Sequence, residues 1–216
     1  MIEDKMSDKS SRARIRPLKR SELSPELRKM AERCTEEELG HLRIAGHVPE
    51  IALARMRWYS ALKNNGILPR RLIELVRLRL AYHNQCAHCM AIRMEDGVAD
   101  GVTETIVCEL EKPYEAPDLT EREKLALRYA DLVATNHFAI DDAFFAELHR
   151  HFTEPEIVEL GINIGAVFGQ QRINVGWNYV DDLPERYQET RPGEIRFGTD
   201  SINGPMRLSK EEQTPV

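Results

Sequence analysis

Several features are scarce or missing in this chain of 216 residues, and each absence argues against a class of protein. No stretch approaches the roughly 18 uncharged apolar residues of a membrane-spanning helix, and the first residues are too polar for a secretory leader. Four cysteines are too few for a disulfide scaffold, and no Asn-x-Ser/Thr glycosylation site occurs. An excess of 36 acidic over 30 basic residues disfavours nucleic-acid binding. We therefore expect a cytoplasmic protein that binds neither nucleic acid nor membranes.

The composition favours one folded domain with appendages. Hydrophobic residues make up 42% of the chain, which is enough for a real core, and the length suits one domain of about 150 residues with extensions. The first twenty residues hold seven bases, three acids and few large apolar side chains. We expect a disordered basic arm at residues 1–20, one all-α domain at residues 21–190 and a loosely ordered tail at residues 191–216.

The apolar residues between these ends repeat with a helical period. No segment shows the alternation of a half-buried strand, so the sequence predicts an all-α bundle. Helix starts are marked by prolines, by capping residues and by two capping boxes. The expected starts are Pro25, Pro49, Pro69, Thr103, Thr120, Asp141 or Asp142, and Thr153. The first helix is expected to close at Gly40, and the helix of the cysteine pair to continue to Gly97 or Gly101.

Three glycines recur every fourth residue late in the chain, at Gly161, Gly165 and Gly169. On a helix this spacing places them on one face, where they allow a close helix crossing within the protomer or between protomers. The spacing differs from the Gly-x-Gly-x-x-Gly fingerprint, so nucleotide binding is not expected there.

The sharpest chemical feature is the pair Cys86 and Cys89. Residues three apart on a helix lie about 5–6 Å apart, which a disulfide can bridge. Asn84 is a candidate helix cap, and a position in the first turns of a helix favours a thiolate. Arg93, four residues beyond Cys89, is expected on the same face, where its charge would stabilise that thiolate.

A proton acceptor must come from another residue, because arginine cannot accept a proton at working pH. His88 lies between the cysteines, His83 precedes them, and Glu74 interrupts an apolar helical run. A buried Glu74 facing His88 would form a proton relay. Alternatively, Glu74 is a surface acid paired with a nearby arginine, and both histidines are merely exposed. The candidate arginine partners are Arg70, Arg71, Arg77 and Arg79.

Two other roles for the cysteine pair remain open. Neighbouring helical residues cannot all converge on one tetrahedral ion, and no second Cys-x-x-Cys completes a zinc site, so zinc is the weaker reading. An inert buried pair is also possible. We favour redox chemistry and expect no metal ion or other cofactor.

Residues Pro69 to Gly101 resemble the carboxymuconolactone decarboxylase superfamily, in particular its alkylhydroperoxidase AhpD-like branch. The matching pattern is a helical glutamate, Glu74, twelve residues before a Cys-x-His-Cys motif. The resemblance implies an all-α fold that assembles as trimers or hexamers. It also implies that the cysteine pair reduces a small peroxide and that an external dithiol restores it. Carried over by position, the family's relay gives Glu74, Cys86, His88 and Cys89, whereas the family's second histidine is replaced here by Arg93.

The sequence thus predicts a homo-oligomeric thiol oxidoreductase. In the expected cycle, the Cys89 thiolate attacks a peroxide and the resulting sulfenic acid condenses with Cys86, while Glu74 and His88 move protons and Arg93 holds the thiolate. One alternative is a cysteine-independent lyase or hydrolase of the decarboxylase type that uses Glu74 and His88 on a small carboxylated ring. The other is a non-catalytic redox sensor whose basic arm binds a partner.

Overall fold

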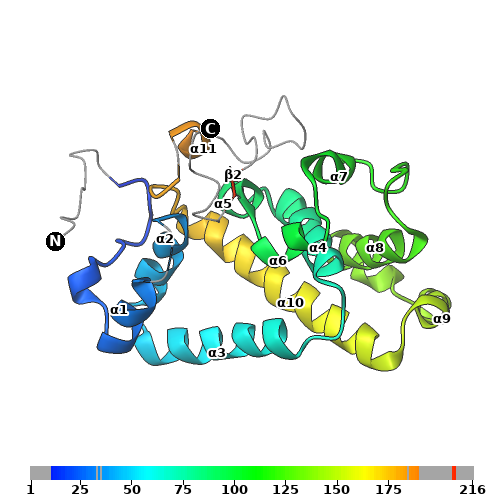
Figure 1. Cartoon of the computed structure of the whole chain (residues 1–216), viewed down its shortest axis with the longest axis horizontal. Helices are drawn as coiled ribbons and strands as arrows, with labels where there is room; N and C mark the ends of the chain where they lie inside the picture. Colours follow the sequence, from blue (N-terminus) through cyan, green and yellow to red (C-terminus); the bar gives the residue numbers. More distant parts are fainter. Residues whose placement is uncertain (1–10, 33, 35, 184, 190–205, 208–216) are drawn as a thin grey trace.

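A computed structural model of the chain describes residues 11–32, 34, 36–183, 185–189 and 206–207 (Figure 1). Within these residues helices dominate, and the strand pairing is a parallel pair of two-residue strands, β1 (Ile92–Arg93) and β2 (Met206–Arg207). The predicted all-α fold is confirmed. The 3-10 helices are η1 (Arg20–Glu22) and η2 (His137–Ala139). The α-helices are α1 (Pro25–Ala31), α2 (Glu36–Ala45), α3 (Pro49–Asn65), α4 (Arg70–Asn84), α5 (Ala87–Ala91), α6 (Glu95–Ala99), α7 (Glu104–Glu109), α8 (Glu121–Thr135), α9 (Asp142–His151), α10 (Glu154–Trp177) and α11 (Glu185–Gln188).

Helix α4 lies at the centre of the main core. It packs most extensively on α8 and on α10, the long helix that crosses the molecule diagonally in Figure 1. Its apolar residues are almost fully buried, as the dense apolar run after Pro69 predicts, and they meet residues of α7 to α10 in one cluster. Burying this apolar surface is the main favourable term in folding. Because α5 follows α4 directly, this core also sets the position of the cysteine pair.

A second apolar cluster joins the N-terminal helices α1 to α3. Helix α3 and the loop after it connect this cluster to α10 by polar contacts. The Tyr59 hydroxyl of α3 donates to the Ala166 carbonyl, and the Ile67 amide of the loop donates to the Glu159 carboxylate at 2.7 Å. Large apolar side chains on α3 remain uncovered in this single chain, since Ile51 is 67% and Trp58 is 44% exposed.

The capping signals of the sequence locate most helix starts correctly. Thr103 and Asp141 cap α7 and α9, and both capping boxes are formed, at Thr120 and Thr153. The predicted end at Gly40 is wrong, because this glycine lies inside α2 and α1 has already ended at Ala31.

The expected long helix after the cysteines is also wrong. Helix α5 ends at Ala91, Ile92 becomes extended, and α6 begins at Glu95. Arg93 is therefore carried by the strand β1 and not by the helix of Cys89.

The three regularly spaced glycines of α10 lie in two different environments. A Cβ on Gly161 would lie 3.3 Å from the Tyr129 hydroxyl, so this glycine faces a neighbouring helix. At Gly165 and Gly169 no described atom lies within 4 Å of such a Cβ. A crossing within the protomer is therefore absent at these two glycines among the described residues, and a crossing between protomers stays a prediction.

Part of the predicted N-terminal arm, residues 11–20, packs against the rest of the chain. The Arg14 amide donates to the Trp177 carbonyl at 2.8 Å, Ser11 donates to Asp181, and Leu18 is buried in the N-terminal cluster. The sequence does not reveal the contact of Ser11 because its partner, Asp181, lies 170 positions away in the chain. Residues 1–10 of the arm, and residues 191–205 and 208–216 of the tail, lie outside the described residues. In the described part of the chain, no helix is both long and apolar enough to span a bilayer.

Candidate active site

The cysteine pair occupies the start of α5 and forms a disulfide, with 5.2 Å between the two Cα atoms. Helix α4 ends just before it because Gln85 adopts a left-handed conformation with φ of 52°. Cys86 is itself the N-cap of α5, and its Sγ accepts the Cys89 amide hydrogen at 3.3 Å. The ring closure expected from the spacing is confirmed. The expected cap, Asn84, is wrong.

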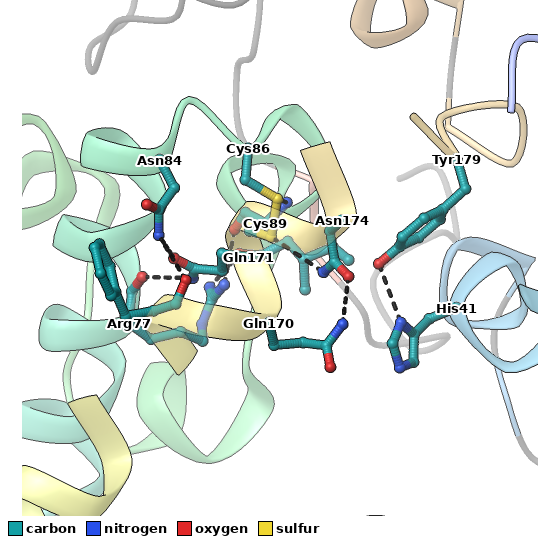
Figure 2. The surroundings of a disulfide bond; sticks show 11 residues. His41, Arg77, Asn84, Cys86, Cys89, Gln170, Gln171, Asn174 and Tyr179 are labelled. Carbon is teal, nitrogen blue, oxygen red and sulfur yellow. Dashed lines mark hydrogen bonds between the residues drawn. A yellow bond between two sulfur atoms is a disulfide. The ribbon is translucent and has the colours of Figure 1, made fainter. Parts of the chain in front are cut away.

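Asn84 instead ties α4 to α10. Its Nδ2 donates to Gln171 Oε1 at 3.1 Å, and Gln171 Nε2 donates to the Arg77 carbonyl at 3.0 Å. Figure 2 shows this pair of amides beside the disulfide. Because both side chains are buried, their hydrogen bonds satisfy groups that would otherwise be costly inside the protein.

Glu74 is buried, at 2% exposure, and its carboxylate is held by Arg77 of the same helix. Arg77 Nε and Nη2 donate to the two carboxylate oxygens at 2.6 and 2.8 Å, and the Met94 amide adds a third hydrogen bond. Arg77 also donates to the Cys89 and Ile92 carbonyls, each at 2.7 Å. Glu74 thus acts on the disulfide loop through Arg77. It has the burial expected of a relay residue and the arginine partner expected of a structural acid.

Arg93 has partners other than the expected thiolate. Its guanidinium pairs with Glu104 of α7 at 2.9 and 3.1 Å and donates to the Met90 and Ile92 carbonyls. The prediction that Arg93 lies one turn beyond Cys89 on one helix face is wrong, because α5 ends before it. Arg93 instead fixes the backbone that follows α5.

The sulfur of Cys89 has a polar neighbour on α10. Asn174 Nδ2 donates to Cys89 Sγ at 3.8 Å, and Asn174 Oδ1 accepts from Gln170 Nε2 at 2.7 Å (Figure 2). Gln170 Oε1 in turn accepts from Arg55 Nη1 at 2.8 Å. A row of hydrogen bonds therefore leads from α3 through α10 to the disulfide.

His88 lies against Tyr179, with 5.0 Å between the ring centroids. The Tyr179 hydroxyl lies 3.3 Å from His41 Nδ1, and His41 Nε2 contacts the Arg55 guanidinium. Because a guanidinium only donates, Nε2 must be the acceptor and Nδ1 carries the hydrogen of a neutral imidazole. Burial, together with the charges of Arg55 and His88, lowers the pKa of His41 to about 3, in agreement with that neutral form. Burial also raises the pKa of Tyr179.

His83 belongs to a different cluster. Its Nε2 lies 2.7 Å from Asp131 of α8, which also accepts from Arg79 and from Tyr114. Burial alone raises the pKa of Asp131, but the hydrogen bonds from His83, Arg79 and Tyr114 outweigh it and lower that pKa to about 2. The described contacts of His83 therefore join α4 to α8.

The disulfide is nearly covered, since Cys86 is 2% and Cys89 is 7% exposed. A small pocket of about 30 Å³ reaches it between the start of α5 and the end of α10. Its lining residues are Gln85, Cys86, Ala87, His88, Asn174, Val175, Asn178, Tyr179 and Val180. Cys86, but not Cys89, is among them. Among the described residues, no group of three or more histidine, cysteine or acidic side chains is arranged to hold a metal ion.

Sequence reasoning missed most of the polar side chains around the disulfide. Gln170 and Asn174 are one turn apart on α10, in a polar stretch with Gln171 and Arg172 that interrupts an otherwise apolar helix, and this interruption was the available signal. His41, Arg55 and Tyr179 carried no comparable signal, because they reach the site from separate segments.

Comparisons with known proteins place this site in a family. The carboxymuconolactone decarboxylase family profile matches residues 49–132, which include Glu74 and both cysteines. An uncharacterized protein of Mycobacterium tuberculosis is 38% identical over 153 residues, covering 64% of this chain and 53% of that protein. The chain thus spans about half the length of the curated relatives it matches.

Three solved structures are similar. A protein of unknown function from Agrobacterium tumefaciens, proposed to be the antioxidant defence protein AhpD, is 30% identical, with a TM-score of 0.54 over 62% of this chain and 91% of that chain. The alkylhydroperoxidase AhpD core of an uncharacterized peroxidase-related protein from Ralstonia eutropha is 16% identical. Its TM-score is 0.67, and the match covers 77% of this chain and 90% of that chain. A cysteine-to-alanine variant of the debrominase Bmp8, solved with 2,3,4-tribromopyrrole, is 20% identical. Its TM-score is 0.63, and the match covers 79% of this chain and 92% of that chain.

The last two likenesses concern the fold alone, and the debrominase illustrates that this fold is found in proteins of varied chemistry. The family profile and the likeness to the Agrobacterium protein agree with the resemblance found in the sequence. The chain belongs to the carboxymuconolactone decarboxylase superfamily, in its AhpD-like branch.

Proposed function

We propose that the protein is a thiol peroxidase that cycles Cys86 and Cys89 between dithiol and disulfide. The single observation that carries the proposal is the disulfide at the start of α5, reached by a pocket that also contains His88. Family membership and the similarity to a proposed AhpD protein support the same reaction type.

In this cycle the Cys86 thiolate attacks one peroxide oxygen and the O–O bond breaks, which leaves Cys86 sulfenic acid and an alkoxide or hydroxide that takes up a proton. The Cys89 thiolate then attacks the Cys86 sulfur, water leaves after protonation, and the disulfide forms. An external dithiol supplies the two electrons that reopen it. His88 lines the pocket beside Cys86 and is the proposed proton donor.

The sequence predicts attack by Cys89, on the strength of Arg93. We assign the attack to Cys86 because Arg93 is paired with Glu104, because the pocket is lined by Cys86, and because Cys86 is the N-cap of α5. Its sulfur accepts a backbone amide hydrogen, a contact that favours a thiolate.

The decarboxylase-type alternative has less support. It requires Glu74 to act as an acid or base on a substrate, whereas both carboxylate oxygens are held by Arg77 and the side chain is buried. The homo-oligomer and the dithiol partner remain proposals that rest on the family resemblance.

The proposal is tested by serine substitution of each site cysteine, with peroxide consumption measured in the presence of a dithiol. Cys86→Ser and Cys89→Ser should each reduce turnover at least a hundredfold. Cys108→Ser changes a cysteine outside the Cys86–Cys89 disulfide; it is the matched control and should retain full activity. Unchanged turnover in both site variants would refute the mechanism.

The size of the pocket predicts selectivity among peroxides. Because the pocket is small, hydrogen peroxide should react at least tenfold faster than the bulky cumene hydroperoxide. Stopped-flow measurement of disulfide formation in the reduced protein checks this order. A faster reaction with the bulky peroxide would show that the pocket does not limit access.

A further inference from the structure

Cys89 is linked to a half-buried arginine, Arg55, by two amide side chains. Arg55 Nη1 donates to Gln170 Oε1 at 2.8 Å, and Gln170 Nε2 donates to Asn174 Oδ1 at 2.7 Å. Asn174 Nδ2 then donates to Cys89 Sγ at 3.8 Å. The three links connect α3, α10 and α5, and Figure 2 shows the last two of them.

The direction of these hydrogen bonds is fixed by their first member. A guanidinium has only donors, so the atom of Gln170 facing Arg55 must be its oxygen. The amide nitrogen of Gln170 then faces Asn174, whose oxygen must accept, and the Asn174 nitrogen is left to face the sulfur. A reversed amide at either position would set two donors or two acceptors against each other.

The charge of Arg55 is available for this role. Within the described part of the chain Arg55 forms no salt bridge, and its contacts are Gln170, His41 and the ring of Tyr59, 5.7 Å away. Burial lowers the pKa of Arg55, yet a guanidinium stays protonated at neutral pH. Its field therefore polarises the two amides in the direction that favours negative charge on the sulfur.

We propose that Asn174 is a further catalytic residue, which stabilises the thiolate of Cys89, and that Gln170 and Arg55 are positioning residues that fix its polarity. This chain of hydrogen bonds from Arg55 through Gln170 and Asn174 is called the relay below. It rests on the proposed function and deepens it at the same two cysteines. It supplies, by a different route, the thiolate stabilisation that the sequence assigned to Arg93. When the disulfide is reduced by a dithiol that attacks Cys86, the S–S electron pair passes to Cys89, so the same donor stabilises the leaving thiolate.

The other charged groups near Cys89 act elsewhere. They are Arg77 of α4, which pairs with Glu74 and donates to the Cys89 carbonyl; His88 of α5, which lies against Tyr179; and Arg93 of β1, which pairs with Glu104 of α7. The described side-chain hydrogen bond to the Cys89 sulfur comes from Asn174.

The test measures the pH dependence of Cys89 alkylation in the reduced, full-length protein. A Cys86→Ser background leaves Cys89 unable to form its disulfide, and peptide mass spectrometry separates its alkylation by iodoacetamide from that of Cys34 and Cys108. Asn174→Leu should raise the midpoint of the alkylation profile by about one pH unit, a tenfold loss of thiolate at a fixed pH below the midpoint.

Gln170→Glu provides the sharper variant. The glutamate keeps the size of the side chain and its pairing with Arg55, but at neutral pH it has no hydrogen to donate to Asn174. Asn174 is then free to turn its oxygen toward the sulfur, so the midpoint should rise as far as in Asn174→Leu, although the fold is retained. Because the new carboxylate also raises the midpoint through its own charge, Gln170→Met is compared with it. Gln170→Met removes the donor without adding a charge and should still raise the midpoint, by a smaller amount, whereas a purely structural role for Gln170 predicts no shift in this variant.

Val175→Ala is the control, because Val175 lines the same pocket and has no polar side-chain group. It should leave the midpoint unchanged. Equal midpoints in the background protein and in Gln170→Met would overturn the relay, whatever the outcome for Asn174→Leu. Alkylation involves no peroxide, so shifted midpoints without peroxide turnover would support the relay and refute the proposed function.

Discussion

Helix α4 carries a buried arginine cluster on each of two faces, and the two clusters stabilise different parts of the molecule. On one face Arg77 holds Glu74 and the carbonyls of Cys89 and Ile92, beneath the disulfide. On the other face Arg79 pairs with Asp131 and donates to the Leu110 carbonyl. The first cluster organises the loop of the site, and the second joins α4 to α8 and to the end of α7.

The difference shows that a perturbed or buried charged group is not by itself a sign of catalysis. Asp131 has a strongly lowered pKa and a histidine partner, yet its described contacts are all to structural neighbours. Glu74 forms a salt bridge with Arg77, and this arginine also reaches the backbone carbonyl of Cys89. Contact with the backbone of the disulfide loop separates the two clusters better than charge does.

The largest expected effect comes from removing either arginine. Arg77→Met leaves the Glu74 carboxylate buried without its partner, which should lower the free energy of unfolding by about 3–5 kcal/mol. Arg79→Met should cost less, about 2 kcal/mol, because Asp131 keeps His83 and Tyr114. Urea unfolding measures both values.

The same two variants should differ in redox behaviour. Loss of the Arg77 anchor loosens the backbone of Cys89 and should speed reduction of the covered disulfide by dithiothreitol several-fold. Arg79→Met should leave that rate unchanged. Equal acceleration by both variants would contradict the division of roles between the two faces.

Acid should weaken the Asp131 cluster. The folded pKa of Asp131 is about 2, below its usual 3.8, so its ionised form is favoured in the folded state. The stabilisation is present above about pH 4 and is lost as the pH falls through 2, with a total of about 2 kcal/mol. The stability of Asp131→Asn should be lower at neutral pH and should lack this part of the acid dependence. Parallel pH profiles of the two proteins in urea unfolding would contradict the assignment.

The smallest effects concern two glycines. A Cβ on Gly97 would lie 2.6 Å from the Cβ of Glu74, so Gly97→Ala should destabilise the protein by about 1–2 kcal/mol through overpacking. On α10, Gly165→Ala meets no atom within 4 Å and should stabilise the helix by about 0.5–1 kcal/mol. Thermal unfolding measures both changes. A destabilised Gly165→Ala that also loses an oligomer in sedimentation would show that this face contacts a second protomer.

Local signals account for most of the fold that the sequence predicted correctly. Thr120 and Thr153 mark helix starts because each capping box is complete within four residues, and the apolar run after Pro69 indicates a central helix on its own. The end of α5 at Ala91 carried no such signal. That helix stops because Arg77 and Arg93 capture carbonyls at its end, and no local pattern reveals which arginine reaches them.

What the sequence by itself determined is therefore local. It determined the helices, a cysteine pair close enough to form a disulfide, and Glu74 on the helix that precedes this pair. What only the tertiary structure decided is the set of groups that face the sulfurs. Asn174 reaches Cys89 across 85 positions of the chain, and Arg77 rather than His88 holds Glu74. The physical reason is that periodicity fixes which residues share a helix face, whereas helix packing and buried hydrogen bonds fix which faces meet.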